Sequence, residues 1–240
     1  MNFELNDEQQ AYIASAKAFS DKALSPHAAQ WDAESIFPKE ALRAAGELGF
    51  MGMYTPESAG GLGMGRLDAS LIVEELAKGC TTTAAFLTIH NMATAMIGKY
   101  CQESAVEAWC PALVMGEKLA SYCLTEPGAG SDAGGLRTSA QQDGDDYVVN
   151  GSKIWTTSAH YADRMFCLVR TKTMGKPQAG ITFLLLEMDT PGLTVEPIHI
   201  LGGDHEFNQV FFEDVRVPQA NRLGAENEGW TVAKYLLEFE

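Results

Sequence analysis

The spacing of apolar residues changes once along this 240-residue chain, near Gly116. Before that point apolar side chains recur every three to four positions, which is the period of an α-helix. After it, short apolar runs alternate with polar residues at a period of about two, as in β-strands. The change predicts an α+β fold, with an N-terminal all-α helical domain over residues 1–116 and a small β-barrel domain over 117–217. Residues 218–240 are then a linker and the start of a C-terminal helix.

Local signals set the expected elements. Asn6, with Gln9 three residues later, is a capping pattern that starts a first helix ending near residue 23. Pro38 is well placed to open the second helix, which is expected at 39–48. Further helices are expected at 68–77, 81–100 and 103–115. Strands are expected at 119–124, 147–149, 164–170, 181–186, 193–198 and 210–212, with a further strand and turn before residue 147.

The chain ends in a helical pattern that begins at Gly229 and carries apolar Val232, Leu236 and Phe239. Such a face needs a partner. In this chain only the earlier domains could cover it, so we expect an exposed apolar helix that favours self-association. This helical pattern stops without a glycine, a proline or a polar terminator, so we also expect that the chain is a fragment.

The segment Tyr122-Cys-Leu-Thr-Glu-Pro-Gly-Ala-Gly-Ser-Asp132 joins an apolar, strand-like run to a polar end. Proline fixes one backbone angle and glycine frees the next, so a tight, exposed loop is expected. Gly128 and Gly130 would let main-chain N–H groups approach a flat or anionic ligand closely. An ordinary surface turn is the alternative for this segment.

Two known motifs do not fit the same loop. Residues 128–133 satisfy the glycine pattern of a dinucleotide fingerprint, but that motif needs a helix next and an acidic residue about 20 positions on. Here a strand, a turn and a strand follow, and the acidic position holds Asn150 and Gly151. A nucleophile elbow around Ser131 would need glycine at Ala129.

Three ordered motifs carry a family resemblance. Leu124–Asp132 is followed by Asn150-Gly-Ser-Lys-Ile-Trp-Thr-Thr157, and then by Phe212-Glu-Asp-Val-Arg-Val-Pro218 with the glycine-containing segment 221–230. Together they resemble the acyl-CoA dehydrogenases over essentially the whole chain. The resemblance implies a flavoprotein oxidoreductase that acts on a CH–CH bond, with FAD as cofactor and an acyl-CoA as substrate. It also implies a large C-terminal helical domain that is missing here, so we expect this fragment to be inactive on its own.

The resemblance also assigns cofactor contacts. Trp155 would pack against the flavin ring, although core packing beside a strand is the alternative for this residue. The hydroxyls of Thr156 and Thr157 would form hydrogen bonds around the ring. The residues expected to line the flavin are Tyr122, Leu124, Thr125, Gly130, Ser131, Trp155, Thr156 and Thr157.

The resemblance assigns fewer residues to substrate binding and to the catalytic base. By resemblance, Ser131 and Glu238 would contact the CoA portion of the substrate, but Glu238 stands where the family usually has Asp. The catalytic base is expected beyond residue 240, and Glu240 is a minor candidate whose alternative is an ordinary solvated carboxylate. Glu126 lies in the loop and is expected to face away from the acyl chain.

The formal net charge of −15 argues against nucleic acid as a partner, because its phosphates would be repelled. The five cysteines form no C-x-x-C pair, as in reduced thiols. The N-terminus lacks a signal pattern, and no apolar run approaches the roughly 18 residues of a membrane span. We expect a cytoplasmic enzyme, or one of the mitochondrial matrix in a eukaryote.

No metal is expected, because neighbours in Asp204-His205-Glu206 point to opposite sides of an extended segment.

The implied reaction is α,β-dehydrogenation of an acyl-CoA thioester to the trans-2-enoyl-CoA, in fatty acid or branched-chain amino acid catabolism. Its electrons would pass to an electron-transfer flavoprotein, and the full-length enzyme would be a homo-oligomer. The alternatives are an acyl-CoA oxidase or flavin monooxygenase of the same fold, or a non-catalytic ligand-binding or assembly module. Segment 81–91 resembles isobutyryl and short branched-chain dehydrogenases, and 202–212 resembles enzymes of longer or dicarboxylic acyl chains, so the acyl chain is not assigned.

Overall fold

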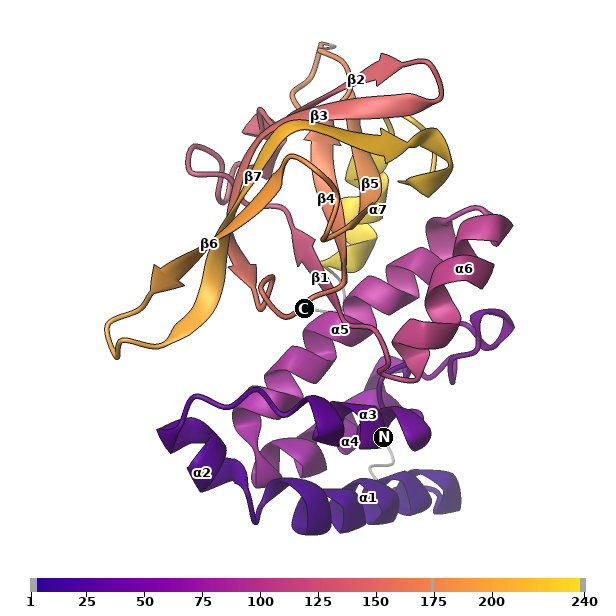
Figure 1. Cartoon of the computed structure of the whole chain (residues 1–240). Coiled ribbons are helices and arrows are strands. Elements are labelled where there is room, and N and C mark those ends of the chain that lie inside the picture. Colours follow the sequence, from indigo (N-terminus) through magenta and orange to yellow (C-terminus); the bar gives the residue numbers. More distant parts are fainter. Residues whose placement is uncertain (1–3, 174, 238–240) are drawn as a thin grey trace.

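The computed structural model describes residues 4–173 and 175–237 and confirms the α+β fold (Figure 1). A helical half is followed by a β half and a short helix. The helices are α1 (Asp7–Phe19), α2 (Ala28–Ala33), α3 (Lys39–Glu47), α4 (Arg66–Gly79), α5 (Thr81–Tyr100), α6 (Glu103–Val114) and α7 (Gly229–Leu236). The strands are β1 (Ala120–Cys123), β2 (Ser139–Asp143), β3 (Asp146–Thr157), β4 (Arg164–Arg170), β5 (Ile181–Glu187), β6 (Leu193–His199), β7 (His205–Pro218) and β8 (Arg222–Leu223).

The start of α1 follows from its cap. The Asn6 side chain accepts the Gln9 backbone N–H at 2.8 Å, and the Gln9 side chain accepts the Asn6 N–H at 3.1 Å. This reciprocal capping box confirms the predicted helix start.

Helix α2 was not predicted, because none of its residues is buried and it therefore shows no apolar stripe.

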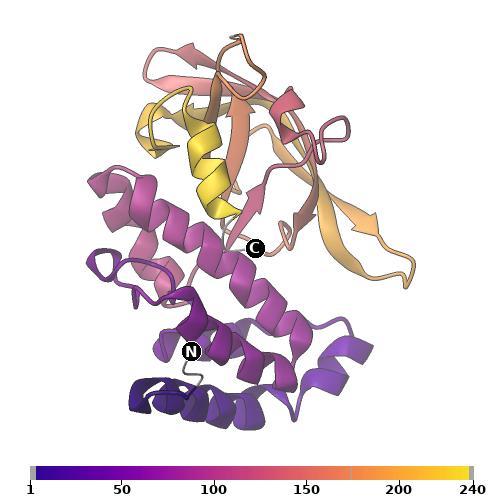
Figure 2. The same ribbon diagram turned by 180° about the vertical axis from the view of Figure 1, so that it is seen from behind.

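Helix α5 joins the two halves of the molecule. It contacts α4 and α6 on the helical side and β1 and α7 on the other, as Figure 2 shows from behind. Its buried polar residues, His90 and Asn91, form hydrogen bonds within the core. His90 Nε2 donates to the Leu113 carbonyl at 2.9 Å, and Asn91 accepts from the Met53 N–H and donates to the Phe50 carbonyl. The pair is therefore a satisfied part of the core.

The strands form one sheet in the order β6-β7-β3-β2-β4-β5-β8, with β1 added in parallel to β4. In the described residues no ladder joins β6 to β8, so the predicted barrel is curled but partly open. Strands β3 and β7 are much longer than expected. Their antiparallel pairing contains register shifts at 149/151 and at 153/156, and the second shift lies directly beside Trp155.

The expectation of an exposed apolar C-terminal helix is wrong for the described part of α7. Val232 and Leu236 are buried in a cluster that also contains residues of α5, β4 and β5. The earlier domains therefore cover this face. Phe239 lies outside the described residues. No helix within 4–173 and 175–237 is long and apolar enough to cross a membrane.

Candidate functional site

The loop after β1 is a narrow exposed turn, as predicted. The N–H of Glu126 donates to the Ala129 carbonyl at 3.1 Å, and the Ala129 N–H donates back to Glu126 at 3.0 Å. Pro127, Gly128 and the residues from 130 to 132 are exposed. The loop thus projects from the end of β1.

Gly128 and Gly130 are not required by the chain itself. Neither has a positive φ, which corrects the expectation that the turn uses the backbone freedom of glycine. A Cβ built at either residue meets no atom of the protein within 4 Å. The absence of a side chain here leaves the loop backbone accessible, which is what a flat ligand lying against its N–H groups would require.

Trp155 is held on the surface by an unusual backbone. Its φ is +62° and its side chain is 53% exposed. A bulky residue in the left-handed region is a true outlier, and such strain is found most often at functional sites. Its ring meets Phe207 edge-on, with centroids 5.9 Å apart. The core-packing alternative for Trp155 is therefore wrong, and contact with a ring-shaped ligand stays a prediction.

The loop and the Trp155 strand lie side by side. The Ile154 N–H donates to the Thr125 carbonyl at 2.9 Å. The structure therefore brings Thr125 next to Trp155, as the sequence-based site requires. Tyr122 and Leu124 are half-buried and pack against the same core cluster, with the rings of Tyr122 and Phe166 stacked at 5.4 Å, so their contacts with a flavin stay predictions.

The two threonines after Trp155 differ in orientation. Thr156 is 1% exposed, and its Oγ1 has no hydrogen-bond partner among the described residues. Thr157 is half-buried and lines a cleft. Both contacts with a cofactor stay predictions, but the geometry favours Thr157, because the Thr156 hydroxyl is enclosed by protein.

The cleft beside Thr157 has a volume of about 200 Å³ and separates the end of β3 from the helical half. Its walls are largely aromatic and aliphatic, with Phe37 stacked on Tyr161 at 4.1 Å. The side chains that give it this character are Trp31, Ile36, Phe37, Phe86, Ile89 and Tyr161. Such a cleft suits an apolar group of modest size.

Sequence reasoning missed His160 in this cleft. Its Nδ1 accepts from the Asn208 side chain at 3.1 Å, and its ring stacks on His205 at 3.9 Å. Burial and the neighbouring His205 lower the pKa of His160, so its neutral form is favoured. A single histidine after the Trp-Thr-Thr motif gave no signal that could have identified it.

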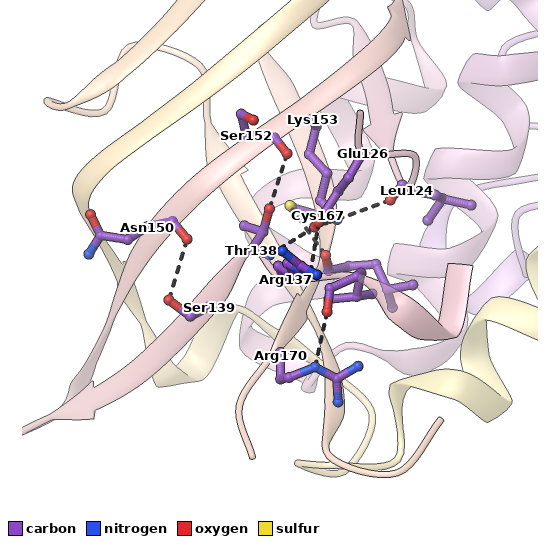
Figure 3. A network of polar contacts seen from close by, with 12 residues as sticks. Leu124, Glu126, Arg137, Thr138, Ser139, Asn150, Ser152, Lys153, Cys167 and Arg170 are labelled. Atoms are coloured by element: carbon purple, nitrogen blue, oxygen red, sulfur yellow. Dashed lines mark hydrogen bonds and ion pairs between the residues drawn. The ribbon is translucent and has the colours of Figure 1, made fainter. Parts of the chain in front are cut away.

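Glu126 is engaged in the interior of the protein. It is 7% exposed and pairs with the fully buried Lys153 at 2.9 Å (Figure 3). Its carboxylate also accepts the N–H groups of Arg137 at 2.6 Å and Thr138 at 2.9 Å. Burial alone would raise the pKa of Glu126, but Lys153 and these donors outweigh burial and lower it. All its contacts are structural, so it is not placed to act as a base.

The remaining predicted site residues give less information. Ser131 is exposed at the loop tip. Glu238 and Glu240 lie outside the described residues. No group of three or more possible metal ligands occurs in the part of the chain that the structure describes.

Comparison with known proteins defines the class. The family models described as "Acyl-CoA dehydrogenase, N-terminal domain" and "Acyl-CoA dehydrogenase, middle domain" match residues 6–117 and 121–215. The chain belongs to the acyl-CoA dehydrogenase family. It is 43% identical over 231 residues to the mitochondrial isobutyryl-CoA dehydrogenase of Dictyostelium discoideum, covering 95% of this chain and 55% of that protein.

Two solved structures share the fold. One is the glutaryl-coenzyme A dehydrogenase glutaryl-CoA complex, with a TM-score of 0.93 and 32% identity over 100% of this chain and 62% of that one. The other is PigA with FAD and proline, with a TM-score of 0.94 and 28% identity over 100% and 63%. The chain spans about half the length of the isobutyryl-CoA dehydrogenases that it matches.

Proposed function

We propose that this chain carries the flavin-contacting portion of an FAD-dependent acyl-CoA dehydrogenase. The observation that supports it most is Trp155, exposed in a strained conformation beside an open glycine loop. Flat apolar surface next to accessible backbone donors fits the isoalloxazine ring of FAD. The isobutyryl-CoA dehydrogenase relative and the FAD-containing PigA structure support the same assignment.

Each residue then has a role in binding. Trp155 covers one face of the ring, and the loop that contains Thr125 and Gly130 supplies N–H donors to its polar edge. Thr157 offers a hydroxyl at the border between ring and cleft. Bound FAD would accept hydride from the substrate β-carbon, while a carboxylate removes the α-proton.

We place the base outside the described residues. Glu126 is held by Lys153 and two backbone N–H groups, so it is not free to approach a substrate. The contact of Ser131 with CoA stays part of the proposal. The apolar cleft beside Thr157 is our candidate for the acyl chain, and isobutyryl-CoA is the first substrate to test.

The finer assignments are proposals of the same kind. Residues 1–116, 117–217 and 218–240 are proposed as helical domain, β domain and linker with the start of a helix. The proposed electron acceptor is an electron-transfer flavoprotein, and the proposed assembly is a homo-oligomer. The proposed location is the cytoplasm, or the mitochondrial matrix in a eukaryote.

A second candidate function, the oxidation of a substrate that is not a CoA thioester, has support from one comparison. The PigA structure holds FAD with proline, so the fold is not limited to CoA thioesters. An oxidase would produce hydrogen peroxide in air without an added acceptor. A non-catalytic module would bind ligand but leave the flavin unreduced.

The test is anaerobic titration of the FAD-loaded full-length enzyme with isobutyryl-CoA and with proline, because the proposed base lies outside the described residues. The 240-residue chain alone is expected to leave the flavin unreduced. Loss of flavin absorbance with isobutyryl-CoA, together with formation of an enoyl-CoA, is the expected result. Bleaching by proline alone would move the assignment to another substrate class. An absence of stoichiometric FAD binding would refute the flavoprotein assignment itself.

A further inference from the structure

Lys153 and Glu126 form a buried ion pair under the loop. Lys153 is 0% exposed and Glu126 is 7% exposed. Taking two charges out of water is costly, and apolar residues of similar volume often stabilise a fold as well or better. The pair therefore needs an explanation beyond stability.

The pair fastens the loop at both ends. The Lys153 ammonium donates to the Leu124 carbonyl at 3.0 Å and to Glu126 at 2.9 Å. Glu126 in turn holds the N–H groups of Arg137 and Thr138. Figure 3 shows these contacts converging on one point beneath the loop. The strand that carries Trp155 thus determines where the loop begins and ends.

The contact to Leu124 also orients a peptide. No peptide bond in the described residues is cis. In a trans peptide the C=O and the N–H point to opposite sides of the chain. Because the Leu124 carbonyl points to Lys153, the Thr125 N–H points away from the buried pair. The following carbonyl, that of Thr125, is fixed by the Ile154 N–H.

The charge has an electrostatic consequence. An ammonium that bonds a carbonyl oxygen polarises the whole peptide, and the N–H of that peptide becomes a stronger donor. The effect is larger in a buried site, where the dielectric constant is low. Here the polarised donor is the Thr125 N–H, in the loop proposed to bind FAD.

We propose that Lys153 is a positioning residue of the flavin site, which orients and polarises the Thr125 N–H and so favours reduced flavin. Negative charge develops at the polar edge of the ring on reduction, so a stronger donor stabilises the reduced form more than the oxidised form. This inference rests on the proposed function.

The variants must leave no buried charge unpaired. In Lys153→Met/Glu126→Gln both charges are removed and the volume is nearly kept. Lys153→Gln/Glu126→Gln keeps a neutral donor for the Leu124 carbonyl and is the second variant if the first does not fold. Tyr147→Phe is the matched control, because it removes contacts to Glu226 and Arg222 from the same strand at a distance from the loop.

The measurements are FAD affinity and the midpoint potential of the bound flavin, both made on the full-length enzyme after circular dichroism has shown that each variant is folded. In the Met/Gln variant we expect oxidised FAD to bind about tenfold more weakly and reduced FAD about a hundredfold more weakly. The additional tenfold loss of affinity for reduced FAD corresponds to a midpoint potential of the bound flavin that is about 30 mV more negative. The Gln/Gln variant should recover the wild-type FAD affinity but not the wild-type midpoint potential. Tyr147→Phe should change neither quantity.

Each outcome decides a different point. If wild-type protein binds FAD and both double variants match it in affinity and potential, the inference is overturned and the pair is structural. If Gln/Gln restores the potential fully, geometry and not charge is responsible, and the polarisation is refuted. If wild-type protein binds no FAD, the proposed function fails and this inference with it.

Discussion

Trp155 and Phe207 meet edge to face, with ring centroids 5.9 Å apart and planes at 80°, across the irregular pairing of β3 and β7. This contact supports only part of the indole, and Trp155 stays 53% exposed. Because Trp155 combines a strained backbone with a largely exposed side chain, we infer that its conformation is kept for a surface contact and not for core packing.

We therefore predict that Trp155→Gly separates binding from stability. Glycine adopts a positive φ freely, and relief of roughly 1 kcal/mol of strain would offset its entropic cost of 0.5–1 kcal/mol. The free energy of unfolding should stay within about 1 kcal/mol of wild type, while FAD affinity falls at least about tenfold if a stacking worth roughly 1.5 kcal/mol is lost. Urea titration and FAD titration measure the two.

The buried Trp109 provides the control. It is 5% exposed, and Arg164 lies over its ring at 4.0 Å. Trp109→Ala should cost about 3–5 kcal/mol of stability. A comparable loss in Trp155→Gly, with FAD binding unchanged, would return Trp155 to a structural role.

The two threonines after Trp155 give a second prediction. Thr156→Val removes a buried hydroxyl that has no partner in the described structure, so stability should be unchanged or raised by up to about 1 kcal/mol. FAD affinity should not change. Thr157→Val should weaken FAD binding several-fold, because Thr157 lines the cleft at its proposed border with the flavin ring.

Equilibrium FAD titration of both variants checks this contrast. Equal losses of FAD affinity would show that the Thr156 hydroxyl turns toward the ligand on binding. That result would restore the sequence-based contact for Thr156.

The accuracy of the sequence predictions depended on how local the signal was. Helix 81–100 and strand 164–170 were predicted with the bounds that the structure has. The helix begins with three threonines and continues as a long apolar segment, and the strand is an unbroken apolar run between Arg164 and Arg170, so both are marked within their own residues. Strand β7 has 14 residues, but only 210–212 was predicted, because its other positions mix buried and exposed side chains.

The candidate site shows the same limit. The position of Trp155 followed from its motif, but its positive φ results from the register shift between β3 and β7, which tertiary pairing creates. The Lys153–Glu126 pair is 27 residues apart in sequence and has no local pattern. Contacts of this kind are visible only when the strands are placed side by side.

The loop glycines give a third prediction. Gly128→Ala and Gly130→Ala place a Cβ in open space at ordinary φ, so stability should be unchanged or raised by about 0.4–1 kcal/mol. FAD affinity should fall at least several-fold if the ligand lies against the loop. Gly151→Ala is the contrasting control, since its φ is +145° and the added Cβ would lie 2.7 Å from Thr138.

Thermal unfolding and FAD titration of the three variants distinguish ligand contact from chain packing. We expect a large loss of stability only for Gly151→Ala. Normal FAD binding in both loop variants would indicate an ordinary surface turn.

The last prediction concerns His90, which couples α5 to β1 and α6. Its Nδ1 accepts the Ala120 N–H at 3.1 Å and its Nε2 donates to Leu113, so the neutral ring satisfies both neighbours. Burial lowers its pKa from 6.5 to about 4. Above pH 6.5 both folded and unfolded states are neutral at this residue, and its contribution to stability is fully present.

As pH falls below 6.5, the unfolded state takes up a proton that folded His90 refuses until about pH 4. The free energy of unfolding should therefore fall by about 1.4 kcal/mol per pH unit, or about 2 kcal/mol between pH 6.5 and 5. Urea unfolding at about pH 7.5 and about pH 5 measures this loss. In His90→Gln, which keeps a donor and an acceptor but does not titrate, the loss should be smaller by that amount. Identical pH dependence in both proteins would show that His90 is protonated in the folded state, against the structure.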